Sequence, residues 1–409
     1  LTMARKMKDS GIEWIGEIPE GWELTKVKRI FDIGRGRVIS QQELTSVGYP
    51  VYSSQTKNNG CLGYISTYDF DKSQLTWTTD GVNAGTVFLR EGKYNCTNVC
   101  GTLAPKNDTN DLRYLKYALE YIAFYHKRAD INGFKIMNNE MAEIELLLPP
   151  LFEQQNIANY LDFKCSQTQS ILEQSLFSIE EYKKLKQAVI TQAVTKTIYD
   201  DFGNPSKFRK LRSLCDVLSK GTTPKDIETQ NDEFYCIRYL KSENIVSNQL
   251  NLNPTFFITA ETNNSLERSK LNSGDILFVI AGASIGKVAI TTADFLPANT
   301  NQAVAFIRLS SSYQYATKYI WYFLQSDVVK QLIALSAVQS AQPNLSLEDL
   351  GAMRLPLPDQ MGCLKITDYL DAKCAEIDKL IAKKEQLVKE LESYKKSLIY
   401  EVVTGKREV

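Results

Sequence analysis

The sequence predicts an α+β chain in which two globular regions, related by an internal repeat, are separated by two long helices packed as an antiparallel coiled coil. Three observations support this fold class. One segment of the sequence recurs about 200 residues later, both copies have coiled-coil spacing, and each copy follows a region of short β-rich runs. A chain of 409 residues also exceeds what one compact core usually holds.

The repeat is the most informative feature. The segment Tyr160–Cys165 recurs as Tyr369–Cys374, an offset of 209 residues. Without a gap, residues 146–197 and 355–406 share 14 identities in 52 positions. We interpret this agreement as a duplication within the chain.

Both copies are predicted to be long helices. Each begins after a proline, and apolar residues then follow at alternating spacings of four and three, which favours a coiled coil. Forty residues of helix extend about 60 Å, too far for the interior of a small domain. Two independent amphipathic helices on separate cores are the alternative. The predicted interface residues are Leu161, Leu172, Ile179 and Val189 in the first copy, and Leu370, Ile377, Ile381, Val388, Leu391 and Leu398 in the second.

The remaining sequence divides around these helices. We leave residues 1–6 out of the fold reasoning. Each globular region has short β-rich runs and one predicted helix, over 112–125 and 315–325, and Gly81–Gly85 resembles Gly282–Gly286. The predicted divisions are an N-terminal segment 7–20, a globular region 21–145, a helical spacer 146–204, a globular region 205–354 and a helical spacer 355–409.

Composition narrows the class of protein. Equal numbers of basic and acidic residues, 48 each, argue against a protein that coats nucleic acid non-specifically. No apolar run is long enough to span a membrane, and no signal peptide opens the sequence. Eight cysteines without a regular framework indicate a reducing cytoplasm, with Cys96 and Cys100 as buried thiols. The single histidine, His126, near a predicted helix end, is not expected to be catalytic.

Catalytic motifs are incomplete. The run Gly282–Val288 lacks the spacing and the hydroxyl of a phosphate-binding loop, so we predict a turn between strands. Pro358-Asp359 with Asp371-Ala372-Lys373 loosely matches a metal-dependent nuclease pattern. We instead expect Asp371 and its repeat partner Asp162 in the first turns of their helices, where the helix dipole favours a carboxylate. The sequence therefore predicts no catalytic residue and no metal ligand.

Basic residues nevertheless cluster at the start of each globular region. Glycines beside them permit close approach to a surface, and arginine and lysine side chains bind phosphates and guanine edges. A solvated basic strand edge is the alternative. The candidate DNA contacts are Lys26, Lys28, Arg35, Arg37 and Lys57 in the first region, and Lys210, Arg212, Lys220, Thr222, Thr223 and Lys225 in the second.

Four motifs then resemble one family, the specificity subunits of type I restriction-modification systems. They are the N-terminal run 8–22, the proline-rich start of the first helix at 148–158, the loop 220–224 and the turn 342–346. The resemblance covers essentially the whole chain. Two places depart from the family pattern: residues 133–137 replace the turn seen in the second half, and residues 359–363 lack the Glu-Gln of the first helix start.

The resemblance implies a non-catalytic, cytoplasmic subunit with two target recognition domains. Each domain would read one half of an asymmetric bipartite site in double-stranded DNA, and the helices would set the spacing. It also implies two modification (adenine methyltransferase) subunits and restriction (translocase and nuclease) subunits as partners. S-adenosylmethionine, ATP and Mg are expected in those partner subunits, with no cofactor in this chain and no membrane contact.

Two alternatives are kept. One is a coiled-coil adaptor protein that does not read DNA, which retention on a specific DNA fragment would separate from the first interpretation. The other is a stand-alone nuclease or methyltransferase, which activity of the purified chain would reveal.

Overall fold

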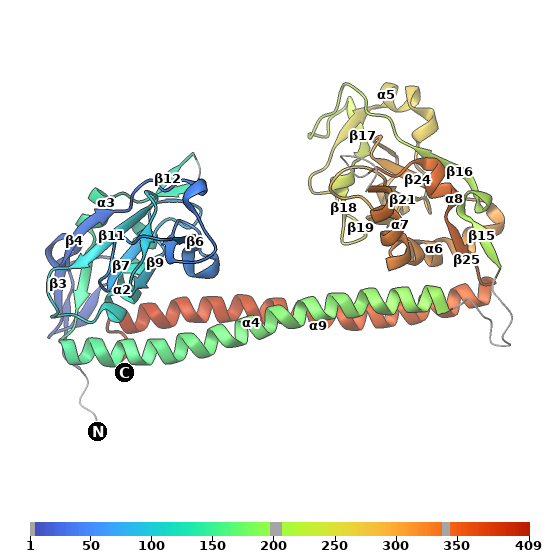
Figure 1. Cartoon of the computed structure of the whole chain (residues 1–409). Helices are drawn as coiled ribbons and strands as arrows, with labels where there is room; N and C mark the ends of the chain where they lie inside the picture. Colours follow the sequence, from blue (N-terminus) through green and yellow to red (C-terminus); the bar gives the residue numbers. More distant parts are fainter. Residues whose placement is uncertain (1–4, 132, 197–206, 338–343) are drawn as a thin grey trace. The chain divides into compact units, whose positions relative to one another are not determined.

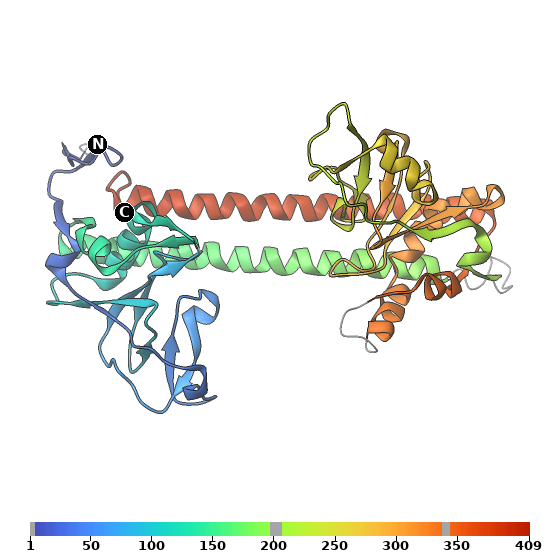
Figure 2. The ribbon, with the colours of Figure 1, turned by 90° about the horizontal axis from the view of Figure 1, so that it is seen from above.

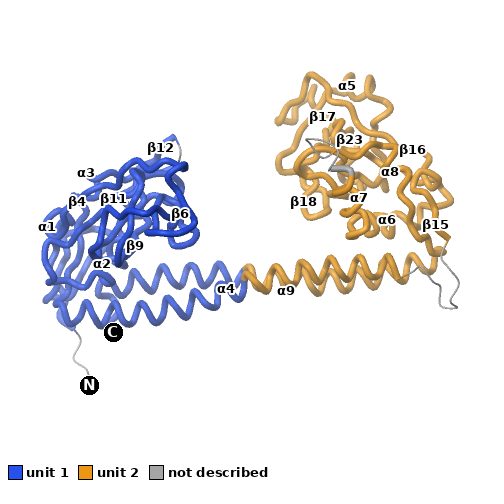
Figure 3. The backbone as a smooth tube through the Cα atoms, viewed as in Figure 1, with its two compact units in different colours: residues 1–175, 386–409 blue, residues 176–385 orange. Residues whose placement is uncertain are grey.

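The computed structural model describes residues 5–131, 133–196, 207–337 and 344–409. They form two compact units, shown in Figure 3, and each unit includes part of both long helices. Unit 1 contains residues 1–175 and 386–409, and unit 2 contains residues 176–385. No helix in the described part of the chain is long and apolar enough to cross a membrane.

Unit 1 begins with a hairpin and contains a four-stranded sheet of order β4-β11-β7-β9, flanked by a side sheet β10-β5-β6 (Figure 1). Its elements are β1 (Met7–Asp9), β2 (Glu17–Pro19), β3 (Glu23–Lys26), α1 (Val27–Ile30), β4 (Phe31–Arg35), β5 (Tyr49–Tyr52), β6 (Cys61–Ile65), β7 (Gln74–Thr78), β8 (Asp80–Gly81), β9 (Val87–Arg90), β10 (Asn95–Cys96), β11 (Cys100–Pro105), α2 (Leu112–His126), β12 (Arg128–Asp130), β13 (Gly133–Lys135), α3 (Asn138–Glu143), β14 (Glu145–Leu148) and the start of α4 (Leu151–Thr195).

Unit 2 repeats this topology, with a four-stranded sheet of order β16-β24-β21-β22 and a side sheet β20-β17-β23. Its elements are β15 (Phe208–Lys210), β16 (Cys215–Lys220), β17 (Tyr235–Leu240), β18 (Ile245–Val246), β19 (Gln249–Leu250), β20 (Phe257–Thr259), α5 (Ala260–Ser265), β21 (Ile276–Val279), β22 (Val288–Ile290), β23 (Ala298–Thr300), β24 (Val304–Leu309), α6 (Thr317–Leu324), α7 (Asp327–Ala337), α8 (Leu347–Ala352), β25 (Arg354–Pro356) and the start of α9 (Gln360–Val403).

The equivalence extends to strand direction. In both units the four-stranded sheet is antiparallel, and the side sheet contains one parallel pair, β5 with β10 and β17 with β23. The turns Gly81–Gly85 and Gly282–Gly286 occupy the same place in both sheets, before β9 and β22. The predicted strand-to-strand turn at 282–288 is therefore confirmed.

The two long helices pair in antiparallel fashion, and both views show them side by side (Figures 1 and 2). In unit 1, Leu161 near the start of α4 joins the same core as Leu398 near the end of α9. In unit 2 the order is reversed, because Val194 near the end of α4 shares a core with Leu370 near the start of α9. The predicted antiparallel packing is confirmed.

The ten predicted interface residues divide into two groups by exposure. Six are buried and four are partly exposed. The buried ones are Leu161, Leu172, Ile179, Leu370, Ile377 and Leu398; the partly exposed ones are Val189, Ile381, Val388 and Leu391. Toward the end of α4 the most buried positions are Ile190 and Val194 instead of Val189, because there the helix also packs on the core of unit 2.

The expected position of Asp162 and Asp371 is wrong. Helix α4 begins at Leu151 and α9 at Gln360, so both aspartates lie about three turns inside their helices. Each accepts hydrogen bonds from the helix that packs on it. The Tyr117 hydroxyl donates to Asp162 and the Tyr322 hydroxyl donates to Asp371, both at 2.8 Å. The carboxylates therefore fasten a domain helix to a long helix, and the dipole explanation does not apply.

A basic side chain of the domain helix also forms an ion pair with each of these aspartates. Arg113 pairs with Asp162 at 3.0 Å, and Lys318 pairs with Asp371. The helices that carry these residues, α2 and α6, match the predicted helices over 112–125 and 315–325, except that residues 311–316 form a 3-10 helix ahead of α6. The difference is at the N-terminus: Asp111 caps α2 with its side chain, whereas the corresponding Ala316 of α6 cannot.

Candidate nucleic-acid interface

In unit 1, several loops meet at one edge of the four-stranded sheet. Strand β4 ends there at Arg35, beside the loop that leads into β11. Gly36 lies so close to that loop that a Cβ atom would stand 2.2 Å from the carbonyl oxygen of Cys96. Only glycine fits such an approach. At this edge the backbone at Gly36 thus crosses the backbone at Cys96, and we call this close approach the backbone crossing. Arg35 and Arg37 lie on either side of it.

Unit 2 has the same crossing at the end of β16. A Cβ atom on Gly221 would stand 1.8 Å from the carbonyl oxygen of Thr300. The next residue, Thr222, accepts a hydrogen bond of 2.8 Å from the Tyr239 hydroxyl through its carbonyl oxygen. The structure thus brings together four predicted contacts, all exposed: Lys220, Thr222, Thr223 and Lys225.

The two arginines of the unit 1 edge differ in charge balance. Arg37 forms ion pairs with Asp69 at 3.0 Å and with Glu43 at 3.4 Å, so its charge is largely neutralised. Arg35 donates through Nε to the carbonyl oxygen of Asn98, and no carboxylate of the described residues lies within ion-pair distance of it. Of these two arginines, Arg35 is therefore the one whose charge is not balanced by a carboxylate of the described residues.

Other predicted residues lie elsewhere. Lys26 and Lys28 precede β4, at the opposite end of the strand from Arg35, and both bind the Glu143 carboxylate. Hydrogen bonds from the two ammonium groups lower the pKa of Glu143 to about 2. Lys210 and Arg212 likewise precede β16. The sequence clusters are therefore each divided between two ends of a strand.

Lys57 lies on a third loop, which follows β5 in the side sheet and is exposed. The Thr97 hydroxyl donates to the Ser53 hydroxyl at 3.2 Å, which joins this loop to the segment that contains Cys96 and Thr97. The same segment is bonded to Arg37, because the Arg37 amide donates to the Cys96 carbonyl oxygen. The unit 1 edge is therefore formed by residues 35–37, 53–60 and 97–99, and we call it edge 1. The corresponding loops of unit 2, residues 220–225 and 300–303, form edge 2.

Sequence reasoning missed the amides of these edges. Asn98 is exposed at edge 1, and Gln302 is exposed at the equivalent position of edge 2. Both stand three residues after an asparagine that is fully buried, Asn95 and Asn299. This repeated spacing was visible in the sequence, and it marks the loop between a buried parallel strand and the next strand of the main sheet.

The described residues include no cluster of His, Cys, Asp or Glu suited to a metal ion. Cys96 and Cys100 are buried, as predicted. His126 ends α2, and burial lowers its pKa.

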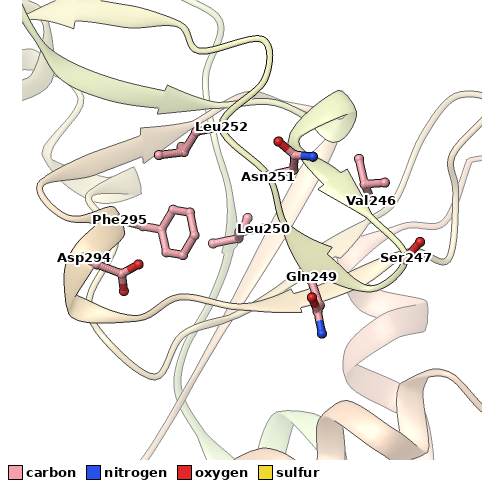
Figure 4. A pocket seen from close by; sticks show the side chains of 8 residues that line it. All are labelled: Val246, Ser247, Gln249, Leu250, Asn251, Leu252, Asp294 and Phe295. Carbon is pink, nitrogen blue, oxygen red and sulfur yellow. The ribbon is translucent and has the colours of Figure 1, made fainter. Parts of the chain in front are cut away.

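An open pocket lies beside the β18–β19 hairpin of unit 2 (Figure 4). Half of its lining residues are apolar, and the side chains of Leu250, Leu252 and Phe295 gather at one side. Asp294 is its one carboxylate, and the Thr292 hydroxyl donates to it. This lining offers no nucleophile with an adjacent base.

Comparison with known proteins decides the family. A family model described as the type I restriction modification DNA specificity domain matches residues 19–181 and 204–390. The chain belongs to this family. Each match covers one globular region and part of the helix that follows it, as expected for a duplicated specificity domain.

Relatives agree with this assignment. A type I specificity subunit of Mycoplasma pneumoniae is 32% identical over 286 residues, which cover 67% of this chain and 70% of that protein. The specificity subunit of the type I restriction enzyme MjaVIII of Methanocaldococcus jannaschii is 25% identical over 95% of this chain and 93% of its own length. A chain solved in work on the assembly and conformational transition of a type I restriction-modification system has the same fold, with a TM-score of 0.71 over 95% of this chain and 99% of that chain at 13% identity.

Proposed function

We propose that this chain is the DNA sequence-recognition subunit of a type I restriction-modification complex. Each unit reads one half of an asymmetric bipartite site in double-stranded DNA, through edge 1 and edge 2. The observation that carries the proposal is the pair of equivalent edges: the same backbone crossing at Gly36 and Gly221 presents different side chains in the two units. One scaffold with two sets of contacts is suited to reading two different sequences.

Base reading is assigned to the side chains that face outward from these edges. Arg35 and Lys220 are suited to the acceptors of guanine, and the amides of Asn98 and Gln302 to adenine. Lys26, Lys28, Lys210 and Arg212 are assigned at most to phosphate contacts, because they precede the strands and lie away from the edges. We assign Lys57, Thr222, Thr223 and Lys225 to contacts with bases or with the adjacent phosphates.

The long helices supply spacing and docking. Helix α4 is one uninterrupted element of 45 residues and α9 one of 44, which supports a role in fixing the distance between the half-sites. We assign the exposed faces of these helices to two modification subunits, which bring S-adenosylmethionine and methylate adenine. Restriction subunits with ATP and Mg join that complex. The chain itself is non-catalytic and holds no cofactor.

The test is selection of duplexes from a randomised library by the full chain, co-expressed with its adenine methyltransferase subunit. The expected product is a motif with two short halves and a fixed gap. Arg35→Ala should degrade one half and Lys220→Ala the other. A wild-type complex that selects no motif would overturn the proposal in favour of the adaptor, and equal degradation of both halves by either variant would overturn the assignment of edges to half-sites.

A further inference from the structure

A fully buried arginine of unit 1 contacts the loop formed by residues 53–60. Arg90, the last residue of β9, is 2% exposed, and no carboxylate of the described residues lies within ion-pair distance of it. Burial lowers the pKa of its guanidinium. A buried charge without a counter-charge is strongly destabilising unless hydrogen bonds and ring contacts compensate for lost hydration. Its presence therefore requires an explanation.

The repeat shows that the fold does not require an arginine at this position of the strand. Counted from the equivalent glycine turns, Arg90 corresponds to Thr291 in unit 2. The two residues that enclose Arg90, Thr76 and Phe88, correspond to apolar Leu277 and Ala289, which lie in a hydrophobic core. Unit 2 also has an arginine on this sheet face, but at another position: Arg308 of β24 pairs with the buried Asp275 carboxylate at 2.7 Å. Arg90 has no such carboxylate partner among the described residues and instead bonds the loop at Asn59, a contact that is particular to unit 1.

The guanidinium makes four contacts in different directions. Its Nε donates to the Thr76 hydroxyl at 3.2 Å, and its Nη1 donates to the carbonyl oxygen of Asn59 at 2.7 Å. The planar group also lies over the ring of Tyr52 at 3.5 Å and over that of Phe88 at 4.2 Å. Among protein side chains, only arginine combines a rigid fork of donors with a flat cationic surface.

The contact with Asn59 reaches the loop formed by residues 53–60. Asn58, Asn59 and Gly60 adopt consecutive left-handed conformations, with φ of 50°, 53° and 80°. A Cβ atom on Gly60 would stand 2.8 Å from Nη2 of Arg90. The loop therefore turns back directly on the guanidinium, which fixes the position of this turn.

The middle of this loop is the exposed part of it. The amide of Ser53 donates to the carbonyl oxygen of Gly60 at 2.9 Å and closes the loop at its base. Between these residues, Thr56, Lys57 and Asn58 are exposed to solvent. Their hydroxyl, ammonium and amide groups are the types that bind phosphates and base edges.

We propose that Arg90 is a positioning residue for DNA recognition, which holds loop 53–60 as a base-reading element of unit 1. The inference rests on the proposed function. Arg90 does not touch DNA; it presents Thr56, Lys57 and Asn58 in one fixed arrangement. Removal of the guanidinium frees the turn, so the outer side chains no longer discriminate among bases.

The experiment compares motifs selected by the full chain with its methyltransferase subunit, for wild type, Arg90→Met and Lys57→Ala. Both variants should lower base discrimination about tenfold at one or two positions of the half-site that Arg35→Ala also degrades, the loss expected from one good contact. The other half should be unchanged. Lys57 is exposed, so its variant tests the loop even where Arg90→Met does not fold.

Two controls separate positioning from general stability. Leu89→Ala removes a neighbouring core side chain without touching the loop, and Thr291→Val alters the repeat-related position in unit 2. At matched loss of Tm, Leu89→Ala should leave the motif intact. Unchanged discrimination in folded Arg90→Met or in Lys57→Ala, loss at both halves, or equal loosening by Leu89→Ala would each overturn the inference. Failure of the wild type to select any motif would instead remove the proposed function.

Discussion

Replacing Gly221 by alanine puts a methyl group into the backbone crossing of edge 2. The new Cβ would stand 1.8 Å from the carbonyl oxygen of Thr300, and contacts below 3.0 Å are essentially never seen, so the two segments must separate by about 1.2 Å. Overpacking of this kind destabilises a protein by about 1–3 kcal/mol. For a unit of about 200 residues, we expect a fall in Tm of about 2–4 °C per kcal/mol.

The same displacement acts on recognition. A shift of about 1 Å lengthens an ordinary hydrogen bond beyond its effective range, and one good base contact contributes about 1–3 kcal/mol of discrimination, or roughly tenfold in binding. We therefore expect Gly221→Ala to weaken discrimination about tenfold at one half-site. Gly36→Ala, whose Cβ would stand 2.2 Å from the Cys96 carbonyl oxygen, should do the same at the other half.

The assay is competition binding of the assembled complex against duplexes altered in one half at a time. Gly21→Ala is the matched control, because a Cβ there meets nothing within 4 Å and the backbone is not left-handed. It should bind like the wild type. Equal loss at both halves for Gly221→Ala, or unchanged discrimination despite the clash, would refute the reasoning that this crossing positions the reading loops.

Three further predictions follow from other contacts. Tyr117→Phe and Tyr322→Phe each remove a hydrogen bond to a helix carboxylate, so each should lower the free energy of unfolding by about 1–2 kcal/mol. Denaturant-induced unfolding should show that the two losses add in the double variant. Hydrogen bonds from two lysines lower the pKa of the Glu143 carboxylate to about 2. The ionised carboxylate therefore stabilises the fold at a pH above its unfolded pKa, and this stabilisation is lost as the pH falls toward 2. NMR titration should show a higher pKa for Glu143 in Lys28→Met, and an unchanged pKa would contradict the pairing. Insertion of four residues at Ser175 should change the half-site gap or prevent assembly, and an unchanged gap would undermine the spacing role of α4.

Much of the fold was predictable because a repeat constrains both halves at once. The identities around Tyr160 and Tyr369 predicted two helices with matching seams, and the packing of Leu161 with Leu398 follows from them. Paired glycines likewise predicted equivalent turns. The prolines predicted the helix starts correctly, yet Asp162 and Asp371 were mispredicted, because each stands about three turns after its helix begins and its tyrosine partner lies 45 or 49 residues away in the sequence.

The candidate site was only partly predictable. Lys28 and Arg35 are close in the sequence but lie at opposite ends of β4, because Lys28 precedes this five-residue strand and Arg35 is its last residue. The ion pairs of Arg37 involve Asp69, a residue 32 positions away, which sequence reasoning could not connect to it. Arg90 gave no signal in the sequence, because its burial without a carboxylate partner among the described residues is visible only in the packing.

The most direct test of the central claim is methylome sequencing of a host that expresses this chain with its adenine methyltransferase subunit. The account predicts one new methylated adenine motif with two different short halves and a fixed gap. It also predicts that Arg35→Ala and Lys220→Ala alter opposite halves of that motif. A stable complex that adds no such motif, or a motif that neither variant changes, would contradict the account.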